Sequence, residues 1–210
     1  MTALVVVAKE PVAGKVKTRL HPPLTLEQAA RLAAAAIDDT LAAIAPLPAT
    51  RRVLLFDGER VPRAATGYEL VQQVGGTLDE RLAALFDAVT GPTVLIGMDT
   101  PQLRADDLAP AFEWSGDIDA WLGPASDGGY WAIAMREPRG DVIRGIPMSR
   151  DDTGSQQRDR LQGAGLRVGT LPQLTDVDTI ATAREVASLA PDTAFARLLS
   201  SFRSSAAGAA

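Results

Sequence analysis

The sequence predicts an α/β protein in which helices cover both faces of a mostly parallel sheet. Short aliphatic segments at 3–7, 52–57 and 93–97 have the continuously apolar, β-branched character of strands that are buried on both faces. Segments with a helical period separate these strands, and this alternation is typical of a parallel sheet. The chain has 210 residues, of which 46% are hydrophobic, so we expect one domain over residues 1–203.

Two capping boxes predict where the longest helices begin. Thr25 stands three residues before Gln28, and Thr77 stands three residues before Glu80. In both segments the following apolar residues recur on one helical face, which predicts helices that pack on the sheet. The other predicted elements are a strand at 68–71, a short helix at 105–114, strands at 120–122, 130–135 and 166–170, helices at 153–163, 180–189 and 193–202, and a disordered tail at 204–210.

A cluster of cations follows the first predicted strand. In a chain whose net charge is -5, this loop holds one acidic residue and four cations: Glu10, Lys9, Lys15, Lys17 and Arg19. A loop at the carboxyl end of a parallel strand is the usual ligand site of an open α/β sheet. A positive loop on an acidic protein favours a small anion, such as the phosphates of a nucleotide, over a solvated loop without a ligand. The spacing excludes a mononucleotide phosphate-binding loop.

The composition excludes several classes of site and partner. Without cysteine the chain has no disulfide or sulfur-bound zinc, and with one histidine it has no multi-histidine metal centre. Any metal must therefore bind carboxylates, and we expect His21 to be a structural loop residue. The acidic net charge disfavours nucleic acid as a partner. No apolar run reaches the roughly 18 residues of a membrane span, and no signal peptide is evident, so we expect a cytoplasmic protein without membrane contact. The sequence does not indicate an oligomeric state.

Four aspartates stand where a ligand site at this sheet edge would need them. Asp99 directly follows a predicted buried strand, and Asp127 lies in a glycine-rich loop. Asp176 and Asp178 precede a predicted helix. Each also has a local interpretation, because aspartate caps helices and forms turns with its own backbone. Combined with the cationic loop they favour Mg2+ (or Mn2+), which binds one or two carboxylates together with substrate phosphates, and Asp99 and Asp178 fit that role.

Four motifs occur together in an order that resembles one known family. They are Ala-Lys-x-Pro-x-x-Gly-x-x-Lys-Thr-Arg-Leu at 8–20, Gly-x-Asp-x-Pro at 97–101, Gly-Pro-Ala-x-Asp-Gly-Gly-Tyr at 123–130 and Asp-x-Asp-Thr at 176–179. Over residues 3 to about 190 the sequence resembles the DUF2064 family of the nucleotide-diphospho-sugar transferase superfamily, whose members include a glycosyltransferase type associated with radical-SAM and arsenosugar pathways. The resemblance implies a single GT-A-type domain with a mixed sheet, which uses a nucleotide and a divalent metal. The chain is also similar to phospholactate guanylyltransferases, whose Lys-Ser-Arg-Leu segment corresponds to residues 17–20.

The resemblance implies a role for the cationic loop in binding a nucleotide. Lys9, Lys17 and Arg19 would contact its phosphates, and we expect Lys15 to join them. Gly14 would let the loop close around the phosphates.

For the metal, the resemblance implies that Asp99 is one ligand. Asp178 would complete the site, and Asp176 is the alternative second ligand.

On the acceptor side, the resemblance implies that Asp127, Gly128 and Gly129 border the acceptor or the sugar, with Tyr130 packed beside them. The chain departs from the family pattern nearby. Relatives often have Ile-Pro-Trp-Ser-Thr where this sequence has Ile-Pro-Met-Ser-Arg at 146–150. Because this segment is expected to shape the acceptor pocket, the identity of the acceptor cannot be taken from relatives.

Two reactions remain open at this point. The leading hypothesis is glycosyl transfer from a nucleotide-diphospho-sugar to a small-molecule acceptor, in which Lys17 and Arg19 stabilise the leaving diphosphate and Asp127 deprotonates the acceptor. The alternative is nucleotidylyl transfer, which joins an NTP to a phosphorylated small molecule and releases pyrophosphate; the number of loop cations suits a triphosphate. A third hypothesis is a non-catalytic nucleotide-binding partner protein, which the retention of both Asp99 and Asp178 argues against.

Overall fold

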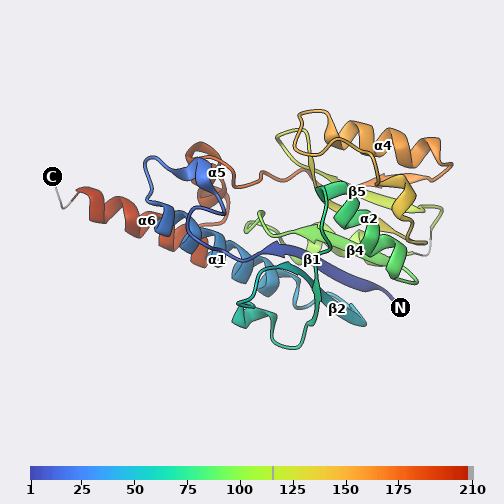
Figure 1. Ribbon diagram of the computed structural model, residues 1–210, viewed down its shortest axis with the longest axis horizontal. Coiled ribbons are helices and arrows are strands. Elements are labelled where there is room, and N and C mark those ends of the chain that lie inside the picture. The colour runs from blue at the N-terminus through green and yellow to red at the C-terminus, as the bar shows by residue number, and fades with distance from the viewer. Residues whose placement is uncertain (115, 208–210) are drawn as a thin grey trace.

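The chain folds around a seven-stranded mixed sheet in the computed structural model, which describes residues 1–114 and 116–207, with side chains through residue 202 (Figure 1). The strand order is β3-β2-β1-β4-β6-β5-β7. Neighbouring strands are parallel, except that β6 is antiparallel to both β4 and β5. The strands are β1 (Ala3–Lys9), β2 (Arg51–Asp57), β3 (Glu69–Gln72), β4 (Thr93–Gly97), β5 (Ala120–Pro124), β6 (Tyr130–Met135) and β7 (Val168–Thr170). The predicted α/β class with a mostly parallel mixed sheet is confirmed.

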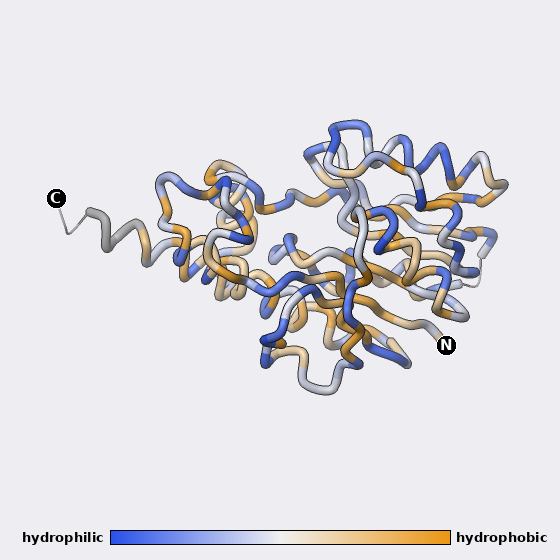
Figure 2. Tube along the Cα trace, viewed as in Figure 1, coloured by the Kyte–Doolittle hydropathy of each residue, from blue (hydrophilic) through white to orange (hydrophobic). Residues whose placement is uncertain are grey.

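Helices cover both faces of this sheet, as the alternation predicts. They are α1 (Leu26–Ile44), α2 (Leu78–Ala88), α3 (Ala105–Leu108), α4 (Thr153–Gly163), α5 (Ile180–Leu189) and α6 (Ala194–Ala207), with 3-10 turns η1 (Thr18–Leu20), η2 (Arg63–Ala65), η3 (Ala109–Phe112) and η4 (Gly140–Val142). One apolar core joins α1 and α3 to one face of the sheet, and a second joins α2 and α4 to the other face. Hydropathy follows this arrangement, since the strands are largely hydrophobic and α4 is largely hydrophilic (Figure 2). Successive residues of one strand, such as Leu4 and Val5, enter opposite cores.

Helix α1 begins at the predicted capping box, and the side chain of Arg52 forms hydrogen bonds at its end. Thr25 Oγ1 accepts a hydrogen bond from Gln28 N at 3.2 Å, and Gln28 Oε1 accepts one from Thr25 N at 2.9 Å. At the other end, Arg52 donates to the carbonyl oxygens of Ile44, Ala45 and Leu47 at 3.1, 2.9 and 2.7 Å. Carbonyls at the end of a helix lack the partners that a further turn would supply, so a cation there adds hydrogen bonds and complements the helix dipole.

A third apolar cluster joins α1 to the C-terminal helices. In Figure 1, α5 and α6 lie beside the first half of α1 at one end of the molecule. Asp39 holds the start of α6 by accepting from Ala194 N at 3.0 Å and Phe195 N at 2.8 Å. Leu20 and Val177 are both buried in this cluster. The loop after β1 and the segment before α5 are therefore anchored in the same core, although they are far apart in sequence.

The strand directions bring four separate segments to one edge of the sheet, which we call the carboxyl edge. The parallel strands β1 and β4 end there. Because β6 is antiparallel to β4, its first residue lies at this edge, together with the loop from β5. Strand β7 is parallel to β5, so the segment that follows it also leaves from this edge. The topology alone therefore gathers the loops after β1, β4, β5 and β7.

Several boundaries differ from the sequence-based expectations. The helix expected over 105–114 is split into α3 and η3, because Pro110 has no N–H to continue the α-helix. The strand expected at 166–170 begins at Val168. Helix α6 continues to Ala207, so it includes four residues that were expected to belong to the disordered tail. The remaining three residues, 208–210, lie outside the described part of the chain.

Candidate functional site

A cavity of about 460 Å3 opens at the carboxyl edge of the sheet. Its lining comes from the loop after β1, the end of β4, the first residues of β6 and the loop before them, the start of α2, and the segments before α4 and α5. The predicted site residues that line it are Lys9, Lys15, Lys17, Arg19, Asp99, Asp127, Gly129, Tyr130, Asp176 and Asp178. The other two predicted residues, Gly14 and Gly128, shape the backbone of loops beside the cavity.

The loop after β1 turns back over α1 and directs Lys17 inward. Gly14 has φ +79°, a left-handed conformation that lets the chain reverse after β1. Val16 then packs on α1, and Leu20 is fully buried in the cluster with α5 and α6. Between these anchors Lys17 itself has φ 48°, which is uncommon for a residue with a side chain and stores strain on the order of 1 kcal/mol. The surrounding packing holds the lysine in this conformation.

The Lys17 ammonium group lies between two aspartates from distant segments. Its Nζ is 2.9 Å from Asp99 Oδ1 and 3.0 Å from Asp178 Oδ1, and only 7% of the lysine side chain is exposed. Arg19 pairs with the second carboxylate oxygen of Asp178. Burial alone would lower the pKa of Lys17, but the charges of Asp99 and Asp178 outweigh it, so the pKa of Lys17 is raised. Lys17 is therefore a buried, charged bridge between the residues that follow β4 and the segment before α5.

Backbone hydrogen bonds assemble the acidic side of the cavity. Val177 N donates to Asp99 O at 3.0 Å, and Ser126 N donates to Leu174 O at 2.9 Å. Helix α5 begins with a capping box whose cap is Thr179, which accepts from Thr182 N at 3.3 Å. Neither Asp176 nor Asp178 caps this helix, so the local interpretation of these two carboxylates does not hold.

Asp176 is the most strongly perturbed acid of the cavity. Burial and the nearby carboxylates of Asp99 and Asp127 together raise its pKa to about 7, against the opposing charge of Lys17. The sequence ranked Asp176 below Asp178 as a metal ligand, since both precede the same helix. The structure separates them: Asp178 has two cationic partners, whereas Asp176 is buried among negative charges. This wall of the cavity therefore carries more negative charge than its cations balance.

The donor set fits a divalent metal of the oxygen-binding kind. Asp99 Oδ1 is buried and close to Lys17 Nζ, yet among the described residues no donor reaches it with hydrogen-bond geometry, so the contact is an ion pair without an aligned hydrogen bond. Asp99 and Asp178 thus define a position for a cation, which the ammonium group fills. No three carboxylates or histidines within 1–114 and 116–207 form a ready metal cage. Mg2+ commonly binds one or two carboxylates together with substrate phosphates, so two are sufficient.

Asp127 occupies the predicted glycine-rich loop and forms a turn with it. Its Oδ1 accepts from Gly129 N at 2.9 Å, which is the local role that the sequence left open. Gly128 has φ +89°, and a Cβ there would collide with the backbone of Asp151. Gly154 N at the start of α4 donates to Gly128 O at 2.8 Å. The loop and α4 are therefore locked together, with the Asp127 carboxylate on the cavity side.

Tyr130 forms the floor of the cavity beside this loop. Burial and the charge of Asp79 raise the pKa of its hydroxyl, so it stays protonated at neutral pH. Its hydroxyl lies 3.9 Å from Met148 Sδ. These contacts agree with the packing role that was expected for Tyr130.

Residues 148–153 form a wall that the sequence pattern did not resolve. Met148, Ser149, Arg150 and Thr153 line the cavity together with the cationic loop. Ser149 has φ 59°, a second strained non-glycine position at the cavity. Arg150 is 59% exposed and its Nε lies 3.1 Å from Asp152 Oδ1. The departure of 146–150 from the family pattern was the only sequence signal for this wall, and Leu78 and Leu82 from α2 were missed altogether.

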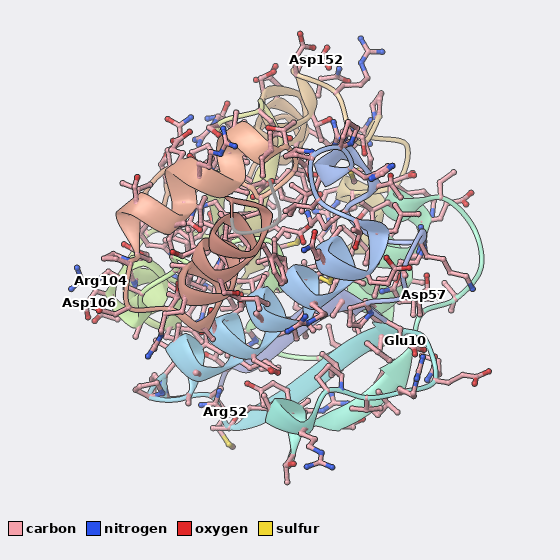
Figure 3. The ribbon with its side chains drawn as sticks, turned by 90° about the vertical axis from the view of Figure 1, so that its left-hand side faces the viewer. Glu10, Arg52, Asp57, Arg104, Asp106 and Asp152 are labelled. Carbon is pink, nitrogen blue, oxygen red and sulfur yellow. The ribbon has the colours of Figure 1, made fainter. Side chains whose placement is uncertain are left out.

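The rim of the cationic loop is more exposed than Lys17. Lys9 Nζ lies 3.8 Å from Asp57 Oδ2, and about half of each side chain is exposed. Glu10 turns away from the cavity and accepts from the backbone N–H of Glu59 at 2.8 Å, which together with Arg60 lowers its pKa to about 2. Figure 3 shows Glu10 and Asp57 near each other where β1 and β2 end. The one acid of the loop therefore does not pair with the cations of the loop.

The sequence of this protein matches one protein family over more than half of its length. The sequence profile of DUF2064, described as an uncharacterized protein conserved in bacteria, matches residues 29–150, which is more than half of the chain. The chain belongs to the DUF2064 family. No curated protein matches this DUF2064 chain significantly.

Solved structures place this DUF2064 protein among GT-A-like transferases. A protein from Desulfovibrio desulfuricans G20, named for an inferred nucleotide-diphospho-sugar transferase activity, is 27% identical, with a TM-score of 0.83 over 98% of this chain and 95% of its own. A CMP-2-keto-3-deoxy-manno-octonic acid synthetase in complex with CTP has a TM-score of 0.58 at 13% identity, over 90% of this chain and 98% of its own. Rv0371c from Mycobacterium tuberculosis H37Rv, in complex with manganese, has a TM-score of 0.54 at 21% identity, over 89% of this chain and 97% of its own. The predicted GT-A fold is confirmed.

Within residues 1–114 and 116–207, no helix combines the length and the apolar character that crossing a membrane requires.

Proposed function

We propose that this protein is a divalent-metal-dependent transferase that moves a glycosyl group from a nucleotide-diphospho-sugar to a small-molecule acceptor. The observation that carries the proposal is that a cationic loop and a group of aspartates line one cavity at the carboxyl edge and meet in the Lys17 ion pairs. The Desulfovibrio relative, which is similar along nearly the whole chain and is named for a nucleotide-sugar activity, supports the same class.

The cationic loop would bind the diphosphate of the donor. Lys9 and Lys15 are exposed at the rim, Arg19 is 69% exposed, and Lys17 lies deepest. As the bond between the sugar carbon and the phosphate oxygen breaks, negative charge grows on the leaving nucleoside diphosphate. Fixed cations that stabilise this charge are commonly the largest contribution to such a reaction. Lys17 and Arg19 are therefore the catalytic cations of the proposal.

The metal would be held by Asp99 and Asp178, with Asp176 behind them. When bound, Mg2+ or Mn2+ supplies positive charge that neutralises the leaving diphosphate. The excess negative charge around Asp176 supports this assignment, since a divalent cation would balance it. Rv0371c, a protein of related fold, is in complex with manganese, which supports the inclusion of a divalent metal in the proposal.

The acceptor would lie between the Asp127 loop and the wall formed by 148–153. Asp127 is the proposed base: one carboxylate oxygen is fixed by Gly129 N, which orients the carboxylate toward the cavity. The acceptor hydroxyl loses its proton to Asp127 as its oxygen bonds to the sugar carbon. The exposed guanidinium group of Arg150, which also lines the cavity, suits an acceptor with an acidic group.

Nucleotidylyl transfer is the second candidate, and the loop cations favour it. Lys9, Lys15, Lys17 and Arg19 together suit a triphosphate better than a diphosphate. In that reaction a phosphate oxygen of the second substrate attacks the α-phosphorus of the NTP, and pyrophosphate leaves. The same Asp99 and Asp178 would hold the metal.

A calorimetric binding panel separates the candidates. Nucleoside triphosphates and nucleotide sugars are titrated into wild-type protein with and without Mg2+. Tight, Mg2+-dependent binding of one nucleotide sugar supports glycosyl transfer, whereas preference for a free triphosphate supports nucleotidylyl transfer. Asp99→Asn should lose the Mg2+ dependence, and Asp106→Asn, an exposed aspartate in α3, is the matched control. If no nucleotide binds, the proposed function is wrong.

A further inference from the structure

The Lys17 bridge has a consequence for the order in which ligands bind. We infer that Lys17 is an internal counter-cation that occupies the metal position in the free protein, so that a divalent metal binds tightly only together with nucleotide phosphates that draw Lys17 away. This inference rests on the proposed function, because it takes Asp99 and Asp178 as the metal ligands.

Geometry makes the ammonium group and the metal mutually exclusive. Lys17 Nζ is about equally far from Asp99 Oδ1 and Asp178 Oδ1, at 2.9 and 3.0 Å, so it lies in the space between both carboxylates. Mg2+ would bind the same oxygens at roughly 2.0–2.1 Å. Two cations cannot share this space at such distances, because their repulsion is weakly screened where the lysine is 93% covered. Metal entry therefore requires Lys17 to leave.

Lys17 does not leave without a new partner. Withdrawing it from the carboxylates, with nothing in its place, would leave a buried charge on the lysine and unpaired charges on Asp99 and Asp178. The phosphates of a nucleotide in the same cavity would supply the new partner for the ammonium group, and the metal would replace it between the carboxylates. The exchange conserves the number of opposite-charge contacts, so each ligand makes binding of the other more favourable.

The backbone of the loop is suited to this exchange. Lys17 is held at φ 48°, a conformation that costs energy for a residue other than glycine. The neighbouring anchors, Val16 and Leu20, are buried in separate clusters and do not depend on the ion pair. Lys17 can therefore change its side-chain and backbone conformation while the loop stays attached to α1.

The test measures metal binding without any nucleotide. Mn2+ is titrated into wild-type protein, Lys17→Met and Lys15→Met, and free Mn2+ is followed by electron paramagnetic resonance. We expect the Kd of Lys17→Met for Mn2+ to be at least tenfold lower than that of wild type. Lys15→Met removes the same charge from an exposed position of the loop and should bind Mn2+ as weakly as wild type. In the double variant Lys17→Met/Asp99→Asn the gain should disappear.

Each other outcome overturns a defined part of the reasoning. If wild type binds Mn2+ without nucleotide as tightly as Lys17→Met, the inference is wrong, while the proposed metal site stands. If Lys15→Met gains as much as Lys17→Met, the effect is one of net charge and the inference is again wrong. If the nucleotide panel described above shows no binding to wild type, the proposed function fails and the inference fails with it.

Wild-type protein provides a second measurement in case Lys17→Met does not fold. In protein labelled with 15N-lysine, the shielded ammonium group of Lys17 should give a correlation signal between its protons and nitrogen, assigned with Lys17→Arg. Mg2+ alone at millimolar concentration should leave this signal unchanged, and Mg2+ with the nucleotide selected by the panel should shift it. Loss of the signal on adding Mg2+ alone would overturn the inference.

Discussion

The two edges of the sheet carry ion pairs of similar length but different character. At the amino edge, where β2 and β3 begin, Arg51 makes two hydrogen bonds of 2.8 Å to Glu69, and both side chains are about half exposed. At the carboxyl edge, Lys17 makes contacts of 2.9 and 3.0 Å to aspartates of the acidic wall, but the lysine is buried. At the amino edge, Arg51 and Glu69 neutralise each other. The carboxyl edge keeps an excess of negative charge beside a loop of exposed cations.

This difference separates the charges that stabilise the fold from the charges that reduce its stability and that a ligand would compensate. Arg52 at the amino edge satisfies three carbonyl groups and stabilises α1. At the carboxyl edge, Asp176 has its pKa raised to about 7, so its charge opposes folding, and Lys17 and Ser149 have strained backbones. Polar groups that reduce stability collect at functional sites, where a ligand compensates them. Four variants test this contrast.

The largest effect is expected at Asp99. Asp99→Asn removes one of the two carboxylates that would hold the metal, and we expect the transfer rate with the donor identified by calorimetry to fall at least about 100-fold. The melting temperature should change little, because the amide oxygen of Asn can still contact the Lys17 ammonium group. Asp106→Asn should keep full activity, because Asp106 is exposed in α3 and does not line the cavity. Full activity of purified Asp99→Asn would contradict the metal assignment.

Asp176 should show the opposite relation between activity and stability. Its folded-state pKa of about 7 lies above the ordinary value of 3.8, so the folded protein holds more protons than the unfolded chain between those values. The free energy of unfolding should therefore fall as pH rises from about 4 to 7 and then level off. Asp176→Asn removes this penalty, so at pH 8 it should be more stable than wild type by roughly 1–3 kcal/mol in urea unfolding, with reduced metal-dependent activity.

The control for the Asp176 prediction is again Asp106→Asn. Figure 3 shows Asp106 beside Arg104, on the opposite side of the view from Glu10 and Asp57. Its stability should follow the wild-type pH profile. If Asp176→Asn is less stable than wild type at pH 8, Asp176 is a structural carboxylate whose charge the fold requires.

A smaller, purely structural effect is expected at Arg52. Arg52→Met keeps most of the aliphatic stem but removes three hydrogen bonds at the end of α1, so we expect a loss of about 1–2 kcal/mol in the free energy of unfolding. Binding of Mg2+ and nucleotide should be unchanged, since Arg52 lies at the opposite edge from the cavity. A change in nucleotide affinity comparable to that of a cavity variant would show that the two edges are coupled.

The smallest effect is expected for the exposed pair at the amino edge. Arg51→Met should cost at most about 1 kcal/mol, and the loss should shrink when the salt concentration is raised, because exposed ion pairs are screened. Glu69→Gln should give a similar value, and the double variant should separate the pair energy from the single effects. An effect as large as that of Arg52→Met, unchanged by salt, would refute this interpretation.

Local sequence determined much of the parallel part of the fold. The capping boxes at Thr25 and Thr77 and the aliphatic strand at 93–97 are each formed by residues that are close in sequence. Their helix period and capping chemistry could therefore be interpreted directly. The split at Pro110 and the extension of α6 to Ala207 were missed. In both cases the competing local signals, a proline and a run of small residues, could not by themselves fix where the helix would end.

The sequence by itself also determined the cations of the loop after β1, because they lie within eleven consecutive residues, and it named the four aspartates that face them. Only the tertiary structure decided how these groups combine. The pairing of Lys17 with Asp99 and Asp178 depends on the antiparallel β6, which turns the β5 loop and the segment after β7 toward this edge. It also depends on Leu20 and Val177 sharing one apolar cluster. The burial that perturbs Asp176 arises from packing between segments that are far apart in the sequence, and no local pattern in the chain encodes such an environment.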